Sequence, residues 1–295
     1  MDERQLLNHR LTRFWTAGSM KSQPGVRGVR DEGVASNLVS PTTPQALAKA
    51  RVFCSSPPRD DGAHVRLLAI ADPHLSSHAA KPMTIFGGNW TGHPEIFFQR
   101  WQETVLEDDV VIISGDISWG LKLPDAMPDL EMIAALPGQK ILVRGNHDYW
   151  WPSIGKLRAA LPANMHALQH DSIIIGDTAI IGTRGWTCPG NDDFDKEDEK
   201  IYARELERLK LAIASLKGKI FTRLIVALHY PPFNARFRES GFTELLEEAQ
   251  ADAVIFGHLH GYKPSRLPKE WKGIPLHFVA CDAVNFVPQI VLEQV

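Results

Sequence analysis

The sequence predicts an α/β fold that contains two regions of sheet. Continuous apolar runs of strand length, bounded by turn residues, indicate buried strands at 67–71, 110–113 and 140–143. Helical periodicity separates these runs at 94–106 and 123–136, and strands that alternate with helices are typical of parallel β-α units. Later in the chain the pattern changes to that of a hairpin, which indicates a second sheet.

The composition excludes several classes of protein. With 295 residues, 44% of them hydrophobic, the chain can bury a full core as one large domain or two small ones. A formal net charge of -3 argues against a nucleic-acid binder that is held mainly by phosphate contacts. No apolar run approaches the roughly 20 residues that a membrane helix needs, so no membrane insertion is expected.

The cysteines indicate a reducing environment. Cys54, Cys188 and Cys281 are far apart in the sequence and form no CxxC pair. Neither a disulfide framework nor a thiolate zinc site is therefore expected. Free thiols are typical of a reducing compartment, which predicts a cytoplasmic protein.

Residues 1–64 differ in composition from the rest of the chain. They are rich in Pro, Ser, Gly and Arg, and apolar residues are sparse, so at most a short helix is expected near 3–15. Such a composition does not readily offset the entropy of ordering the chain. We therefore expect a disordered tail, or a mis-annotated extension upstream of an alternative start codon at Val65, followed by one domain over 65–295.

The first predicted strand ends in Asp72-Pro73-His74. Asp72 and His74 lie two residues apart, so in an extended segment they project to the same side and can reach one metal ion. An Asp-Pro turn with an incidental histidine is the alternative.

A polar, glycine-rich loop at 76–93 follows directly and is expected to lie beside the site. Lys81 and Trp90 in this loop are candidate substrate contacts. The alternative is a surface loop that is held in place by its aromatic side chains. The periodicity of the next helix, 94–106, places these side chains inward: Ile96, Phe97, Trp101, Val105 and Leu106.

Two more strands end in polar residues. The strand at 110–113 precedes Asp116, and the strand at 140–143 precedes the Gly-Asn-His-Asp of residues 145–148. An amide, an imidazole and a carboxylate packed this closely are costly to desolvate without partners, which indicates a functional site. A polar turn, with the asparagine capping the next helix and the histidine on the surface, is an equal alternative. These clusters fall at the carboxyl ends of strands, where open α/β sheets place ligands.

The second sheet is expected to begin with a hairpin formed by 173–175 and 179–181. An acidic loop and an amphipathic helix at 198–217 follow. The loop could bind a cation, although a solvated helix start is favoured, through Asp192, Asp193, Asp195 and Glu197.

Two further buried strands, at 224–228 and 253–256, end in histidines. His229 follows the first strand, and His258 and His260 follow the second. The remaining expected elements are one helix and two strands that close the second sheet, at 242–250, 276–279 and 290–292.

Each polar cluster is a weak signal alone, but strand ends that repeatedly carry metal-binding side chains make a strong one. The candidate ligands are Asp72, His74, Asp116, Asn146, His229, His258 and His260. Nitrogen and oxygen donors together suit zinc, iron or manganese. So many ligands exceed what one tetrahedral ion uses, and they fit two ions that share Asp116 and clamp a phosphate for in-line displacement.

These motifs, D-x-H, G-D, G-N-H-D, a lone histidine and G-H-x-H in this order, resemble those of the calcineurin-like metallophosphoesterase superfamily over residues 65–295. Within it, residues 81–83, 115–120, 145–151 and 183–186 are similar to a bacterial branch of largely uncharacterised phosphoesterases. The resemblance implies a four-layer αββα sandwich, in which two sheets are flanked by helices.

The resemblance also implies roles for the site residues. The implied cofactors are two divalent transition-metal ions (Mn2+, Fe2+/Fe3+ or Zn2+), one on Asp72, His74, Asp116 and His260 and the other on Asp116, Asn146, His229 and His258. A hydroxide shared by the ions would attack phosphorus, and His147, oriented by Asp148, would protonate the leaving oxygen. The implied activity is hydrolysis of phosphomonoesters or phosphodiesters, with a small molecule as the expected substrate.

The sequence departs from the protein phosphatases of this superfamily at one point. Those proteins carry an arginine shortly after the G-D motif, whereas this chain continues with Ile117-Ser118-Trp119-Gly120, so protein-phosphatase activity is not expected. Arg144 and Arg184 are candidate replacements for the phosphate contact, and structural surface arginines are the alternative.

Three other interpretations stay open. One is a non-catalytic scaffold with the same fold, which the complete ligand set disfavours. Another is a nuclease, which the lack of a dense Lys/Arg face disfavours. The third is a lipid-nucleotide pyrophosphatase, which would need a stronger amphipathic membrane helix than the sequence contains.

Overall fold

A computed structural model of the protein describes residues 65–79 and 81–295, which all lie within one compact unit, Val52–Val295. The predictions for residues 1–64 lie outside the described residues. The helices are α2 (His93–Thr104), α3 (Leu123–Ala134), α4 (Ile154–Ala160), α5 (Lys196–Ala214) and α6 (Gly241–Glu248), with short 3-10 helices η1 (Met83–Phe86), η2 (Gly88–Trp90) and η3 (Pro264–Arg266). The strands are β1 (Leu67–Ile70), β2 (Val110–Ser114), β3 (Gln139–Val143), β4 (Met165–Ala167), β5 (Ser172–Ile175), β6 (Thr178–Thr183), β7 (Arg223–Leu228), β8 (Ala253–Phe256), β9 (Glu270–Trp271), β10 (Ile274–Phe278) and β11 (Gln289–Leu292).

The first sheet has the strand order β11-β1-β2-β3-β4. β1 to β4 run parallel, as the alternation of apolar runs and helices predicts. Ile70 pairs with Ile113, and Ile113 pairs with Leu142. Because these residues are level across the sheet, the polar residues that follow them leave the sheet side by side.

The second sheet has the order β5-β6-β7-β8-β10-β9. The hairpin of β5 and β6 is confirmed, with Ile175 paired to Thr178. β6, β7, β8 and β10 run parallel. Their carboxyl ends therefore also share one edge, where β7 and β8 end in the predicted histidine clusters.

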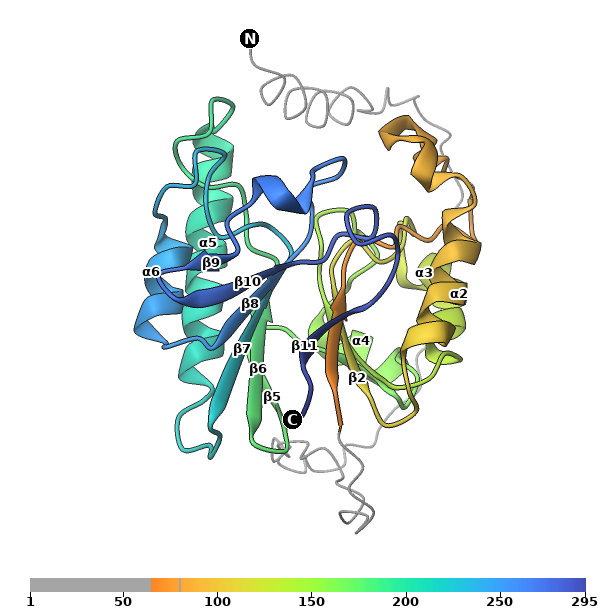
Figure 1. Ribbon diagram of the computed structural model, residues 1–295, viewed down its shortest axis with the longest axis horizontal. Coiled ribbons are helices and arrows are strands. Elements are labelled where there is room, and N and C mark those ends of the chain that lie inside the picture. Colours follow the sequence, from red (N-terminus) through yellow and green to blue (C-terminus); the bar gives the residue numbers. More distant parts are fainter. Residues whose placement is uncertain (1–64, 80) are drawn as a thin grey trace, which may run out of the picture. The chain divides into compact units, whose positions relative to one another are not determined.

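The two sheets and their helices form the predicted four layers, with α2, α3 and α4 against the first sheet and α5 and α6 against the second (Figure 1). Alternation along each strand produces this packing: Leu68 and Ile70 face α2 and α3, whereas Leu67 and Ala69 face the second sheet. The layer between the sheets is apolar and includes Ile112, Ile141, Ile180, Ile225 and Ile255. The packing of this apolar layer determines the position of one sheet relative to the other, and therefore the position of their strand ends.

The structure corrects several expectations about the elements. The run 290–292 does not close the second sheet, because β11 pairs antiparallel with β1 at the edge of the first. After β10 the chain crosses from the second sheet to the first at Val279–Cys281, where backbone hydrogen bonds of 2.8 and 2.9 Å join Val279 and Cys281 to Ala71. Leu106 is 61% exposed rather than inward, since α2 ends at Thr104.

The acidic loop that the sequence showed as a possible cation site is a helix start. The Asp195 side chain accepts hydrogen bonds from the backbone of Glu197 and Asp198 and caps α5. Within residues 65–79 and 81–295, every helix is too short or too polar to span a bilayer.

Candidate metal centre

The predicted ligands converge where the carboxyl ends of strands from both sheets meet. β1, β2 and β3 are neighbours in the first sheet, and β7 and β8 are neighbours in the second. Hydrogen bonds join the sheets at this edge. Ser114 Oγ donates to the Leu228 carbonyl oxygen over 2.5 Å, and the backbone N–H of His258 donates to Asp72 Oδ2 over 2.8 Å.

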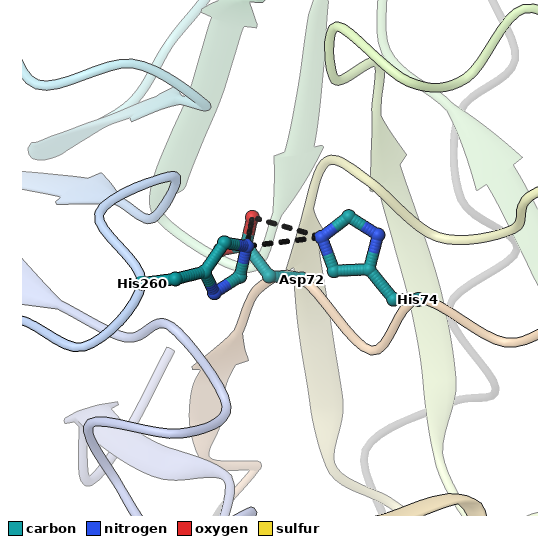
Figure 2. Close-up of side chains that lie close together, drawn as sticks. All are labelled: Asp72, His74 and His260. Carbon is teal, nitrogen blue, oxygen red and sulfur yellow. Dashed lines mark hydrogen bonds and ion pairs between the residues drawn. The ribbon is translucent and has the colours of Figure 1, made fainter. Parts of the chain in front are cut away.

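One group of side chains consists of Asp72, His74 and His260, which point toward one another from two different sheets (Figure 2). Asp72 Oδ1 lies 3.6 Å from His260 Nε2 and 4.0 Å from His74 Nε2. The two imidazole nitrogens are 3.0 Å apart. All three side chains are at least 93% buried, since their exposed fractions are 0%, 2% and 7%.

A second group consists of Asp116, His229 and His258, whose ligand atoms lie within 4.8 Å of one another. Asn146 joins it, because its Oδ1 is 2.8 Å from His229 Nε2. Asp116 Oδ2 lies 3.4 Å from His229 Nε2 in this group and 3.6 Å from His74 Nε2 in the other. Asp116 thus stands between the two groups.

The backbone at the predicted ligands is unusual. Asp72, His74, Asp116 and His258 have φ values of 62°, 46°, 52° and 70°, in the left-handed region that few non-glycine residues adopt. The Asp72–His74 segment is therefore not extended, as the sequence pattern had suggested, and a left-handed turn brings both side chains to the site. Such conformations cost on the order of 1–3 kcal/mol each and cluster at functional sites.

Glycines make room for these side chains. A Cβ on Gly145 would stand 2.1 Å from Asp116 Oδ1, and a Cβ on Gly257 would stand 2.3 Å from Asp72 Oδ2. A Cβ on Gly115 would stand 2.5 Å from His229 Nδ1. The glycines of the G-D, G-N-H-D and G-H-x-H motifs are thus required by the close approach of the acids and histidines.

Outer partners hold two of the imidazoles in place. His229 Nδ1 lies 2.9 Å from the Ser114 carbonyl oxygen, which leaves Nε2 toward Asp116. His260 Nδ1 lies 3.3 Å from Asp282 Oδ1, which leaves Nε2 toward Asp72 and His74. Histidines that bind metals characteristically give their second nitrogen to a carbonyl or a carboxylate in this way.

Burial and neighbouring charges shift the pKa values of the acids and imidazoles in the cluster. Burial lowers the pKa of His74 and of His258 well below the ordinary value. Burial also acts on Asp116, but the charges of His229 and His147 outweigh it and hold the pKa of that carboxyl well below its usual range. For His229, burial is outweighed by the carboxylates of Asp116 and Asp72, which raise its pKa to about 9.

The donor set fits cations. Asp72 Oδ1 and His74 Nδ1 are buried and have no hydrogen-bond partner among the described residues. Two imidazole nitrogens that face each other at 3.0 Å, with carboxylates beside them, are donors arranged around a common point. Buried carboxylates and imidazoles are stable at such density when they coordinate a metal.

Comparison with known families agrees with this geometry. The sequence model of the family described as calcineurin-like phosphoesterase matches residues 65–262, which is more than half of the chain. The chain belongs to the calcineurin-like phosphoesterase family. Membership supports metal-dependent hydrolysis of phosphoesters in general, and proteins of this family typically bind divalent metals.

Two solved structures are similar to this calcineurin-like phosphoesterase. One is the protein of unknown function AQ665 from Aquifex aeolicus, with 16% identity, a TM-score of 0.42, and coverage of 77% of this chain and 96% of that chain. The other is the phosphopantetheinyl hydrolase PptH from Mycobacterium tuberculosis, with 15% identity, a TM-score of 0.48, and coverage of 74% and 90%. No curated protein matches the sequence at a significant level.

His147 lies at the open side of the phosphoesterase centre. It is 17% exposed, and its Nε2 is 4.0 Å from Asp116 Oδ2. Its backbone N–H donates to Asp116 Oδ1 over 2.8 Å. The position of the imidazole is thereby tied to the carboxylate that stands between the two groups.

Asp148 is fully buried beneath the loops. Its carboxylate accepts hydrogen bonds from the backbone N–H groups of Asp116, Ile117, Ser118 and Gly145, at 2.7 to 3.3 Å, and from the Trp150 indole. These bonds tie the loop after β2 to the loop after β3. Asp148 therefore holds together the two loops, one of which carries His147.

The candidate substrate contacts in the loop after β1 occupy different places. Lys81 Nζ lies 4.4 Å from the Trp119 ring centroid, and that ring stacks on His74 at 4.8 Å and lies 4.6 Å from the His147 ring. Trp90 is only 1% exposed and packs edge-on against His260. A substrate contact by Trp90 is therefore not supported, because its ring is enclosed by neighbouring side chains, and the alternative of an aromatic that holds the loop in place applies.

Arg144 and Arg184 follow β3 and β6 and line one pocket beside the centre. The Arg184 carbonyl oxygen accepts hydrogen bonds from the backbone of His229 and Tyr230, at 3.1 and 3.0 Å. The Arg184 guanidinium donates to Glu205 over 3.0 Å. Neither arginine is a fully exposed surface residue.

Two residues at the site carry roles that the sequence did not reveal. Trp119 forms one wall of the centre, and Asp282 orients His260 and accepts a hydrogen bond from the Gly261 backbone over 2.6 Å. Trp119 follows the G-D motif and could have been noticed as an aromatic at a strand exit. Asp282 follows no recognisable motif, and only the crossing of the chain to the first sheet brings it to His260.

Proposed function

We propose that the protein is a dinuclear metal-dependent phosphohydrolase that cleaves phosphomonoesters or phosphodiesters of a small molecule. The observation that carries this proposal is the place of Asp116. Its Oδ2 lies 3.4 Å from His229 Nε2 and 3.6 Å from His74 Nε2, so one carboxylate serves both groups of donors. Two cations that share a carboxylate form the clamp that suits displacement at phosphorus.

The residues that would hold the first cation are Asp72, His74, Asp116 and His260, and those for the second are Asp116, Asn146, His229 and His258. Their mixture of nitrogen and oxygen donors suits Mn2+, Zn2+ or Fe2+/Fe3+. When bound, such cations neutralise phosphate oxygens and acidify water. Hydrogen bonds hold the carboxylates in place, because Asp116 Oδ1 accepts one from the His147 backbone and Asp72 Oδ2 accepts one from the His258 backbone.

His147 is the proposed general acid. Its Nε2 is oriented toward the Asp116 side of the site, and the side chain keeps contact with solvent through its 17% exposed surface. In this position a protonated Nε2 can donate its proton to the oxygen of the leaving group. Asp148 is proposed as a positioning residue, since its hydrogen bonds hold the loops that carry Asp116 and His147.

The proposal is tested by turnover of aryl phosphates with Mn2+, Zn2+ or Fe2+ added. Wild-type protein should release the aryl alcohol in a metal-dependent way, and His147→Ala should lower kcat by about 100- to 10,000-fold while retaining its metal. Metal content is measured in the same samples. Absence of metal-dependent turnover on every ester, in protein that contains two ions, would favour the scaffold interpretation instead.

Location and partners complete the proposal. The described cysteines, Cys188 and Cys281, are free thiols, which supports a cytoplasmic enzyme, and a bacterial origin is proposed from the motif resemblance. A small-molecule substrate is favoured over nucleic acid by the net charge of -3. Binding to single-stranded DNA that weakens steeply with salt would instead favour a nuclease.

A further inference from the structure

A pocket rich in arginine lies next to the candidate metal centre. Its lining includes Arg144, Gln169, His170, Arg184, Glu205 and Arg208, and we refer to it as the arginine pocket. Arg144 precedes Gly145 and Asn146 directly, and the Arg184 carbonyl oxygen accepts a hydrogen bond from the backbone of His229. The pocket is therefore linked to Asn146 by two peptide bonds and to His229 by a backbone hydrogen bond.

The charges of the arginine pocket do not balance. Glu205 is fully buried, and its carboxylate accepts hydrogen bonds from Arg184 over 3.0 Å, Arg208 over 2.6 Å and Thr183 over 2.6 Å. Three guanidinium charges and one carboxylate charge leave a surplus of two positive charges. His170 adds none at neutral pH, because burial and the nearby Arg208 lower its pKa.

Arg144 carries one of the two surplus charges. Among the described residues, no carboxylate lies within ion-pair distance of it, and its Nε is buried without a hydrogen-bond partner. The Nε of Arg184 is likewise buried and without a partner in the described part of the chain. Two guanidinium groups that lie near each other, with donors left unused, form a site that an anion would complete.

We propose that the arginine pocket binds a second phosphate group of the substrate, so that the preferred substrates are small molecules with two phosphate groups. This inference rests on the proposed function, because the first phosphate group would be the one hydrolysed at the metal centre. A phosphate dianion matches the surplus of two charges, whereas a carboxylate would leave one uncompensated. Guanidinium groups also bind phosphate oxygens in a two-pronged geometry that lysine lacks.

The test compares α,ω-alkanediol bisphosphates of two to six carbons with the monophosphates of the same alkanediols. Wild-type protein with Mn2+ should prefer the bisphosphate at one or more lengths, with kcat/KM higher by about tenfold or more, mainly through KM. Arg144→Gln should reduce that preference by about tenfold, and Arg144→Lys should keep part of it.

Arg100→Gln is the matched control, because Arg100 is exposed on α2 and pairs only with Glu103 in the described chain. It should leave the preference for bisphosphates unchanged. Equal kcat/KM for bisphosphates and monophosphates at every length would overturn the proposal. So would an equal preference in the Arg144→Gln and Arg100→Gln proteins.

A binding measurement separates this inference from the proposed function. If neither kind of ester is hydrolysed, the hydrolase proposal fails, and the pocket is judged by calorimetry with inorganic pyrophosphate in the presence of EDTA. Binding to wild type that is about tenfold weaker in Arg144→Gln supports the arginine pocket as an anion site. No binding to wild type, or equal affinity in the two proteins, overturns it.

Discussion

Asp148 illustrates how a single buried carboxylate can organise a site without facing the reaction. Four backbone N–H groups and one indole donate to it. Charge-assisted hydrogen bonds of this kind are about twice as strong as neutral ones. The motif resemblance implies that Asp148 orients His147, and in the structure its carboxylate is bonded to the backbone of two loops.

Replacement of Asp148 with asparagine should therefore destabilise the fold. The amide that takes the place of the carboxylate presents N–H donors where the loops also present N–H donors, so we expect a loss of about 3 kcal/mol in the free energy of unfolding. Urea denaturation measures it. Asp171→Asn is the control, because Asp171 is 36% exposed and pairs with Arg158 at the surface. Equal stability of the two variants would contradict the role given to Asp148.

Metal uptake should depend on pH through His229. Its pKa is raised to about 9, so the metal-free site keeps a proton on this imidazole at pH 7, and a cation must displace it. The affinity for Mn2+ should rise by about tenfold per pH unit between pH 7 and 8 and level off above the pKa of His229. Below pH 7 the rise should be steeper, because burial raises the pKa of Asp72 to about 7 and this carboxyl must then lose a proton as well. Calorimetry in buffers of different ionisation enthalpy measures the released proton. An affinity that is flat over this range would show that His229 is already neutral.

At the scale of elements, the sequence predicted those strands whose apolar runs are continuous, such as β2 and β7. It missed β4, which has three residues, and α4, which has seven, because elements this short do not show a recognisable hydrophobic periodicity. It also placed the last strand in the wrong sheet. The pairing of Ile290 with Leu68 depends on the crossing of residues 279–281 beside Ala71, which no local pattern encodes.

Lys140 is an element-scale feature that hydrophobic patterning does not explain. It lies in β3, is fully buried, and its Nζ donates to the carbonyl oxygens of Gly138, over 2.7 Å, and Leu136, just beyond the end of α3. Lys140→Met keeps the volume but leaves these oxygens without the donor. We expect a loss of about 1–3 kcal/mol in the free energy of unfolding, measured by urea denaturation.

The control for Lys140→Met is Lys156→Met, since Lys156 is exposed on α4. Its effect should stay within about 0.5 kcal/mol. A Lys140→Met protein as stable as this control would mean that water reaches the end of α3 and replaces the ammonium group.

At the scale of the whole molecule, the site exists only because two sheets meet with their carboxyl ends together. The sequence could predict that the ligands gather, since every cluster follows a strand. It could not predict that Asp282 reaches His260, or that Arg144 and Arg184 line one pocket, because residues far apart in the sequence are joined there only by the packing of the sheets. The motifs therefore predicted the candidate ligands, and the structure shows which residues contact them.

We propose that residues 65–295 form the whole catalytic domain. Val65 and Arg66 already belong to the first sheet, because their carbonyl oxygens accept hydrogen bonds from Val295 and Val110, at 2.9 and 3.0 Å. A chain that begins at Val65 should keep kcat within about twofold and its melting temperature within a few degrees, since 1 kcal/mol shifts the melting temperature by about 2–4 °C at this size. Calorimetry and the aryl phosphate assay measure both. If this chain failed to fold and a chain that begins at Val52 folded, the N-terminal boundary of the domain would lie upstream of Val65.

The glycines beside the acids and histidines have a consequence for how such proteins are judged from their genes. At Gly145 one added methyl group would occupy the space of Asp116 Oδ1, 2.1 Å away, although no ligand would be lost. A relative that has all the metal-binding residues but an alanine at the position of Gly145 would be classified as an enzyme from its sequence and would nevertheless be inactive. To decide from its sequence whether a homologue is active, the glycines of its motifs must therefore be checked as well as the metal-binding residues.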